Sequence, residues 1–341
     1  MSPRWRYALA LGVAAPALYL LKDRLPGEDA VVGALTGLDP IWLGAAVLAE
    51  VMSMSTFARL VRRLLAVGGT RLTMPRAVAL TYARTAVSNS LPAGPVLSLA
   101  YVTRELSRLG AAKPLIAATL VLSGVYSTAT FTLLGVVALL AEPATRPYAL
   151  AVACLLLAVA SAMVRLHLHP VRDWMRRHSP AVLEQLRAAR EAIRPGRRDR
   201  VVLAGLALAN WMLDIACLGF VCAAAGVSIS PPTVLFGYVA AKAAAILALI
   251  PGGLGVAEFG LGATFVAAGV TGGAAAAVVL LYRLISYWAV LVTGWLAWAL
   301  LLDRVRAALV QAGHWGWTAL LRMGAAMGPC AALYGYRDLP R

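Results

Sequence analysis

The stretch that decides the fold is residues 250–258, IPGGLGVAE, which interrupts an otherwise apolar segment from residue 232 to 269. Adjacent Pro and Gly end a helix, because Pro lacks a backbone N–H and Gly lowers the cost of a turn. A similar break, LPAGP at residues 91–95, interrupts the segment from residue 75 to 108. Its second arm has only eight residues before Arg104, too few to cross a bilayer. Both segments are therefore predicted to be re-entrant hairpins of two half-helices, covered by protein or water.

Long uncharged blocks surround the two breaks. The chain has 341 residues, of which 61% are hydrophobic and only 13% are charged. Soluble domains carry about 25% charged residues, so this composition excludes an ordinary cytosolic enzyme, a disordered protein and a coiled coil. It predicts a polytopic membrane protein. The blocks expected to span the membrane, the first of them short for a span, are residues 7–21, 41–65, 114–141, 147–164, 201–225 and 274–302.

The net charge of +16 is better explained by membrane topology than by nucleic-acid binding, because basic residues collect in cytoplasmic loops. With the N-terminus inside, the inner segments hold 25 Lys and Arg residues, whereas the outer loops hold three. This predicts the cytoplasmic (inner) membrane, with both termini and the basic loop 165–200 on the cytoplasmic side. The tail, residues 304–341, is expected to be an amphipathic, interfacial segment.

The two breaks also align with each other at an offset of 159 residues, which pairs Pro92 with Pro251. The order of span, hairpin and span then occurs twice, over about residues 41–140 and 200–302. An odd number of crossings separates the copies, so they are expected to form an inverted repeat, a construction of many transporters. Chance similarity between Ala- and Leu-rich helices is the alternative. The predicted fold is an all-α membrane domain over residues 1–303, with about six transmembrane helices plus two re-entrant hairpins.

Ionisable side chains inside apolar segments are the first candidate site residues, since each costs about 2.5–3.5 kcal/mol at the bilayer centre. They are three bases and three acids: Arg84, Lys242, Arg283, Glu50, Asp214 and Glu258. Their charges sum to zero, so they either pair structurally or form a polar cavity for a charged headgroup. A headgroup role is favoured for Arg283, which lies deepest in its block. For Glu258, pairing with Arg283 or Lys242 is favoured over the uptake of a proton, and coupling or pairing is expected for Glu50 and Asp214.

The hairpin backbone is the second candidate. The half-helices after Gly94 and Gly253 are expected to start deep in the membrane, and helix N-termini bind anions. Gly252 and Gly253 would let the backbone approach a headgroup, or would only permit the turn. Asn89 at the first tip would cap backbone or contact the ligand. The predicted substrate-binding set is Arg84, Asn89, Gly94, Lys242, Gly252, Gly253, Glu258 and Arg283.

Metal, cofactor and catalytic signals are weak. The four cysteines, at positions 154, 217, 222 and 330, have no zinc-type spacing, and the loop histidines have no acidic or Cys partner at ligand spacing. No catalytic His, Asp and Ser constellation is recognisable. The expectation is therefore a protein without metal or cofactor that is not an enzyme.

Three motifs carry a resemblance to a known family: SNSLPAG at residues 88–94, IPGGLGVAE at residues 250–258 and LYRLISYW at residues 281–288. With these motifs, roughly residues 35–302 resemble the bacterial and archaeal flippase-like family named after the transmembrane region of lysylphosphatidylglycerol synthase. That region is also the lipid-translocating domain of the multiple peptide resistance factor. The synthase name comes from a fused soluble aminoacyl-transfer domain, for which the 39 residues after residue 302 are too short.

The resemblance implies a flippase-like transporter that moves an anionic phospholipid or a polyprenyl-phosphate-linked precursor across the cytoplasmic membrane. Membrane lipids are then its expected partners, with no role for nucleic acid. A secondary transporter of a small soluble solute fits the repeat equally well. A third possibility is a membrane partner of a glycosyltransferase that transports nothing itself.

Overall fold

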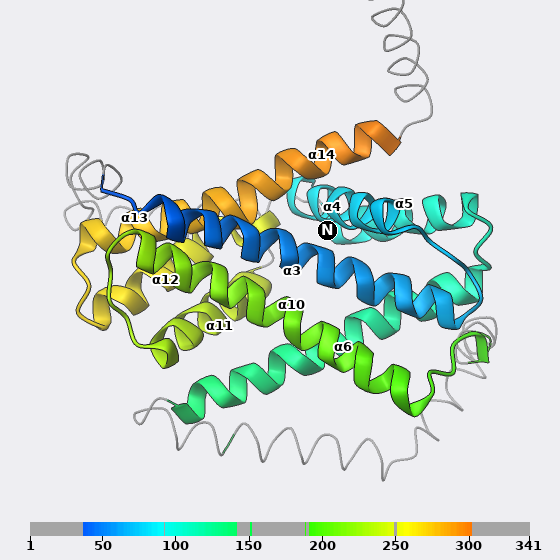
Figure 1. Cartoon of the computed structure of the whole chain (residues 1–341), viewed down its shortest axis with the longest axis horizontal. Helices are drawn as coiled ribbons and strands as arrows, with labels where there is room; N and C mark the ends of the chain where they lie inside the picture. The colour runs from blue at the N-terminus through cyan, green and yellow to red at the C-terminus, as the bar shows by residue number, and fades with distance from the viewer. Residues whose placement is uncertain are drawn as a thin grey trace, which may run out of the picture.

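The computed structural model describes residues 37–91, 93–141, 151, 188, 191–248 and 251–301. In this part of the chain every regular element is a helix (Figure 1). The predicted spans at residues 7–21 and 147–164 and the tail lie outside the described residues, as does most of the loop 165–200.

The first half of the bundle contains four helices: α3 (Pro40–Val67), α4 (Met74–Ser90), α5 (Gly94–Arg108) and α6 (Lys113–Ala141). The start of α3 follows from its sequence, because the Asp39 carboxylate accepts a hydrogen bond from the Ile41 N–H and Pro stands at the first helical position. Helix α4 ends at the first predicted break. Ala93 there adopts a left-handed conformation (φ 57°) before α5 begins.

The second half repeats this order with α10 (Arg197–Ala224), α11 (Pro231–Ala248), the short 3-10 turn η3 (Pro251–Gly253) and α12 (Val256–Ala267). The break in this second half is longer than predicted. The half-helix begins at Val256 rather than directly after Gly253, because three glycines of the break have positive φ, the last of them Gly255 (φ 84°).

The last described element is a 30-residue helix, Gly272–Leu301, made of α13 (Gly272–Arg283), a π turn η4 (Leu284–Ala289) and α14 (Val290–Leu301). A π turn inserts an extra residue into a helix and rotates everything that follows. Such turns are often found at functional sites. Here the π turn falls within the LYRLISYW motif and directly follows Arg283.

Four helices of the described part are long and apolar enough to cross a membrane: α3, α6, α10 and the helix Gly272–Leu301. Each has 28 to 30 residues, or about 42–45 Å at 1.5 Å per residue. They correspond to four of the predicted spans. Large apolar side chains project outward from all four, as expected where lipid is the solvent.

Helices α5 and α12 are much shorter, with 15 and 12 residues, or about 22 and 18 Å. Each packs against the helix that precedes its break, α5 against α4 and α12 against α11. Neither is long enough to cross about 30 Å of hydrocarbon as a helix.

The two halves match in their turns as well as in their order of helices. Gly110 (φ 83°) and Gly269 (φ 91°) end α5 and α12 and lie 159 residues apart. The same offset relates Ala93 (φ 57°) to Gly252 (φ 65°) in the two breaks. Corresponding helices α3 and α10 lie side by side and run in opposite directions (Figure 1).

Helices of one half also pack against helices of the other: α14 packs along α4, and α6 packs on α11. Gly294 of α14 faces Tyr82 and Ala86 of α4, and Gly135 of α6, again 159 residues earlier, faces Val239 of α11. Small residues at such crossings let helix backbones approach closely. This mutual packing brings the two breaks together in the middle of the bundle.

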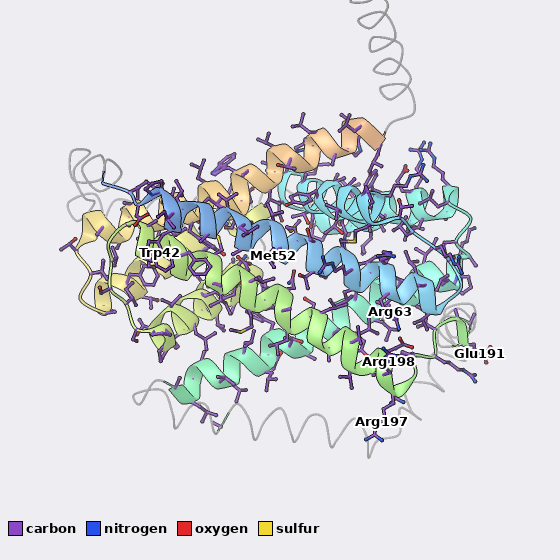
Figure 2. All side chains as sticks on the ribbon, viewed as in Figure 1. Trp42, Met52, Arg63, Glu191, Arg197 and Arg198 are labelled. Carbon is purple, nitrogen blue, oxygen red and sulfur yellow. The ribbon has the colours of Figure 1, made fainter. Side chains whose placement is uncertain are left out.

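Basic side chains gather at one end of the bundle. Arg63, Arg197 and Arg198 lie there, whereas Trp42 lies at the opposite end (Figure 2). Arg63 forms an ion pair with Asp199 (2.5 Å), which ties the C-terminal end of α3 to the start of α10.

Candidate functional site

A cavity of about 660 Å³ lies between the two breaks. Ala93 and Gly94 line it from the first break, and Gly252 and Gly253 line it from the second. Pro92 itself lies outside the described residues, but its neighbours on both sides face this cavity. The two breaks therefore share one cavity, although residues 94 and 253 are far apart in the chain.

Arg283 is the most extensively bonded charge in the cavity. Its Nε donates to Glu258 Oε1 (2.5 Å), and its Nη2 donates to the carbonyl of Gly252 (3.0 Å). The guanidinium also lies 4.3 Å from the centroid of the Tyr287 ring, in a cation–π contact. Of the two predicted partners for Glu258, the structure thus selects Arg283. The pair joins the second break to the end of α13.

Lys242 is the second cation that lines the cavity. Its ammonium lies 3.3 Å from Asp214 Oδ2, which places the carboxylate of α10 directly behind the cavity wall. Asp214 also accepts hydrogen bonds from Tyr238 (2.6 Å) and Tyr282 (2.8 Å). Both Asp214 oxygens are therefore occupied, and Lys242 is the charged member of this group that lines the cavity.

Two long-range hydrogen bonds hold the first break against the last helix. Tyr287 donates its hydroxyl to the carbonyl of Asn89 (3.3 Å), and Trp295 donates its ring N–H to Ser90 Oγ (3.1 Å). The Asn89 side chain is left to line the cavity. The π turn, which contains Tyr287, thereby contacts both breaks.

The glycines of the breaks are required by the backbone itself. A Cβ at Gly94 would collide with the carbonyl of Ser88, one at Gly252 with the Tyr287 ring, and one at Gly253 with Ala245. Gly252 and Gly253 also have positive φ (65° and 62°). The turn alone is therefore sufficient to explain why these positions are glycine.

The expected free N–H groups at the half-helix N-termini are absent at the start of α5. Gly94 N donates to the Leu91 carbonyl (2.8 Å), and the amides of residues 96 and 97 both donate to Ala93 (3.0 and 3.1 Å). At the start of α12, Glu258 already places a carboxylate in the first turn. The N–H groups at the start of α5 are therefore used within the chain, and the two cationic side chains of the cavity are its clearest candidates for contact with an anion.

Most of the predicted set meets in this cavity. The lining residues among them are Asn89, Gly94, Lys242, Gly252, Gly253, Glu258 and Arg283. Arg84 lies elsewhere, with its guanidinium over the Phe57 ring of α3 at 5.9 Å. Glu50 and Asp214 are not in the lining. Distance from the break along the chain does not determine which face of the helix a residue occupies, and Arg84 is on a face outside the cavity lining.

Sequence reasoning did not single out the aromatic residues of the site. Tyr238, Tyr282 and Tyr287 line the cavity together with Ser88 and Ser286. A usable signal existed for two of them, because Tyr282 and Tyr287 flank Arg283 in the LYRLISYW motif. Tyr238 lies four residues before Lys242 and hence on the same face of α11.

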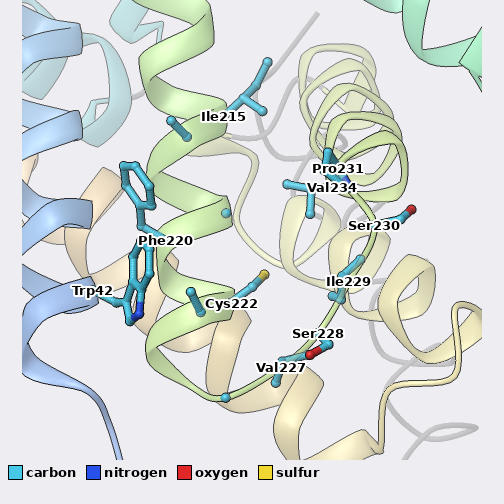
Figure 3. Close-up of a pocket in the computed structure, with 14 residues that line it drawn as sticks. Trp42, Ile215, Phe220, Cys222, Val227, Ser228, Ile229, Ser230, Pro231 and Val234 are labelled. Carbon is cyan, nitrogen blue, oxygen red and sulfur yellow. The ribbon is translucent and has the colours of Figure 1, made fainter.

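A second cavity, of about 740 Å³, lies at the end of the bundle that contains Trp42 (Figure 3). Trp42 stacks on Phe220 there (5.7 Å between ring centroids), and the loop after α10 forms the opposite wall. None of its lining residues is charged, and none belongs to the predicted set. Within the described residues, no group of three or more His, Cys, Asp or Glu side chains could hold a metal ion.

Four helices that are long and apolar enough to cross a membrane define a multi-pass membrane protein. The chain belongs to the family described as lysylphosphatidylglycerol synthase TM region, which matches residues 7–294. It is also similar to a UPF0104 membrane protein of Methanothermobacter thermautotrophicus, with 35% identity over 89 residues. That match covers 26% of this chain and 27% of the relative, so it supports the family and not a shared activity.

Proposed function

We propose that this protein is a flippase-like transporter, rather than an enzyme, that moves an anionic phospholipid or a polyprenyl-phosphate-linked precursor across the cytoplasmic membrane. One observation carries the proposal. The cavity has two cations in its wall, Lys242 and Arg283, and two lining side chains at its rim, Val96 and Ile246, that are 68% and 63% exposed. Apolar side chains exposed on a membrane protein face hydrocarbon, so this rim suits an acyl or polyprenyl chain beside a bound headgroup.

The headgroup would be held by exchange of ionic partners. Arg283 and Lys242 are each paired with a carboxylate. A phosphate that enters the cavity offers the same charge and can accept two parallel N–H bonds from Arg283, whereas Glu258 accepts one. Glu258 and Asp214 would then keep the empty site neutral and yield the cations to the substrate.

The inverted repeat would supply the two access states. The antiparallel directions of α3 and α10, the exchanged packing of the halves and their matching turns support an inverted repeat with two re-entrant hairpins. Rocking of one half against the other would open the shared cavity to one leaflet at a time. The gathering of arginines at one end of the bundle supports a cytoplasmic orientation of that end.

A reconstitution experiment tests the proposal. Purified protein in liposomes is given fluorescent phosphatidylglycerol or fluorescent phosphatidylcholine, and an impermeant quencher reports how fast each lipid leaves the inner leaflet. Faster movement of the anionic lipid than in protein-free liposomes, with little movement of the zwitterionic one, is the expected result. Movement of neither lipid, together with uptake of a soluble anion, would favour a solute transporter. If neither a lipid nor a soluble anion moves, the result would favour a membrane partner protein that transports nothing itself.

A further inference from the structure

Glu50 of α3 is a buried acid that the proposed headgroup site does not use. Its residue is only 6% exposed, and its Oε2 has no hydrogen-bond partner among the described residues. It lies ten residues after the start of α3, or about 15 Å along the helix axis. Ala46 and Ser53, which share its helix face, are buried too, and Ser53 donates to the carbonyl of Asn210 on α10 (2.9 Å). This face is therefore turned toward α10 and the interior of the bundle.

The surroundings of Glu50 contain one cation and several acids. From the elements packed around it, the titratable groups within electrostatic reach are Asp214 and Cys217 on α10, Lys242 and Tyr238 on α11, Tyr82 on α4 and Tyr282 on α13. Lys242 is the only basic group of this set. Its ammonium lies 3.3 Å from Asp214, so its charge is already matched by that carboxylate.

Counting charges in this set gives two carboxylates for one ammonium. With both acids ionised, the set carries one net negative charge inside the bundle, and Glu50 has no counter-ion of its own. A buried carboxylate in that position is strongly disfavoured unless it takes up a proton. We propose that Glu50, together with Asp214 and Lys242, forms a proton-binding site in which Glu50 carries one exchangeable proton that is coupled to headgroup binding in the adjacent cavity.

Lys242 provides the physical link between the two sites, because it lines the cavity and also contacts Asp214. An anion that draws the ammonium into the cavity weakens the positive charge beside the two carboxylates. Their affinity for a proton rises, so a proton from water binds the fraction of Glu50 that is still ionised, and that carboxylate becomes a carboxylic acid. Release of the anion returns Lys242 to Asp214 and lowers this proton affinity again. By linkage, proton binding strengthens anion binding to the same extent. The coupling rests on the proposed transport function, whereas the proton site does not.

A bound proton fits this set better than a bound metal ion. Both oxygens of Asp214 already accept hydrogen bonds, from Tyr238 and Tyr282, and its Oδ2 also contacts the Lys242 ammonium. That ammonium would repel a metal cation beside it. Glu258, the other acid with a buried unpartnered oxygen, has its charge matched by Arg283 at 2.5 Å. Among the acids of the described bundle interior, Glu50 is therefore the one without a matching cation.

Infrared spectroscopy of the full-length protein in lipid nanodiscs tests the proton site without any transport assay. At pH 7 an exposed Glu, with a usual pKa near 4.3, is protonated to only about 0.2%. The expected result is a carbonyl band of a protonated carboxylic acid that shifts when Glu is labelled with carbon-13. The band should disappear in Glu50→Gln and persist in Glu105→Gln, the matched control, whose carboxylate pairs with Arg108 on α5.

The carbon-13 shift is measured on the wild type, so it assigns the band to a Glu residue even if Glu50→Gln does not fold. No such Glu band at pH 7 would overturn the proposal. So would a band that persists in a folded Glu50→Gln protein. A band that vanishes on replacing potassium with sodium would assign the site to a sodium ion instead and would equally overturn it.

The coupling is measured by proton uptake, with a pH-sensitive dye, when short-chain phosphatidylglycerol is added to the protein in weak buffer. At a pH where the Glu50 band has half its full height, uptake of up to about half a proton per protein is expected for the wild type, and none for Glu50→Gln or Lys242→Met. Uptake that is unchanged in Lys242→Met would refute the link. A Glu50 band in a protein that moves no lipid would support the proton site and reject the transport function. A protein that moves lipid but lacks the Glu50 band would support the transport function and reject the proton site.

Discussion

Replacing Arg283 is the sharpest test of the headgroup site. In the empty cavity its guanidinium donates to Glu258 and to the Gly252 carbonyl. If a phosphate takes the place of Glu258, the variant Arg283→Ala loses at least one hydrogen bond between charged groups, which contributes about 1.5–3 kcal/mol. At about 1.4 kcal/mol per tenfold change, movement of phosphatidylglycerol should slow about 10- to 150-fold. Arg283→Lys should keep part of the rate, because the charge remains but the two-pronged geometry does not.

The same substitution leaves Glu258 without its cation, so a loss of transport has a second explanation. The double variant Arg283→Ala with Glu258→Gln removes both charges and therefore distinguishes the two explanations. If Arg283 only neutralises Glu258, the double variant should transport as well as Glu258→Gln alone, and that result would refute the role in headgroup binding. Arg63→Ala is the matched control, since Arg63 is an ion-paired arginine at the end of the bundle, remote from the cavity. Thermal unfolding and gel filtration check that each variant is folded.

The remaining predictions concern backbone, packing and orientation. Gly252→Ala should destabilise the protein by about 1–3 kcal/mol, because the left-handed conformation is strained for Ala and the methyl group meets Tyr287. Gly262→Ala, in the open middle of α12, should be neutral or raise the melting temperature slightly. Gly294→Val should push α14 away from α4 and lower both the melting temperature and transport, and wild-type values in both assays would contradict this packing. Single cysteines at positions 185 and 227 of a Cys-free protein should react with impermeant reagents only from the cytoplasmic side and only from the outside, respectively. The reverse pattern would overturn the orientation.

The sequence alone was enough to locate the helices and the two breaks between them. Breaks and spans are local properties, because Pro and Gly disrupt the helix in which they stand, and apolar length is read along a single segment. Four predicted spans and both breaks therefore appear at the expected positions, within a few residues. The charged residues were found for a similar reason, since an ionisable group in an apolar block stands out without reference to any neighbour.

The partners of those charges were decided only by the tertiary structure. Arg283 pairs with Glu258 and Lys242 with Asp214, across 25 and 28 positions of the chain, and the reverse pairing was equally consistent with the sequence. The π turn after Arg283 is also invisible in the pattern, yet it places Tyr287 against the first break, 198 residues away. Which face of one helix meets which face of another depends on the packing of the whole bundle. For this reason the sequence could name the charges of the cavity. Only the fold could show that Arg84 lies outside it and that Glu50 has no counter-ion among the described residues.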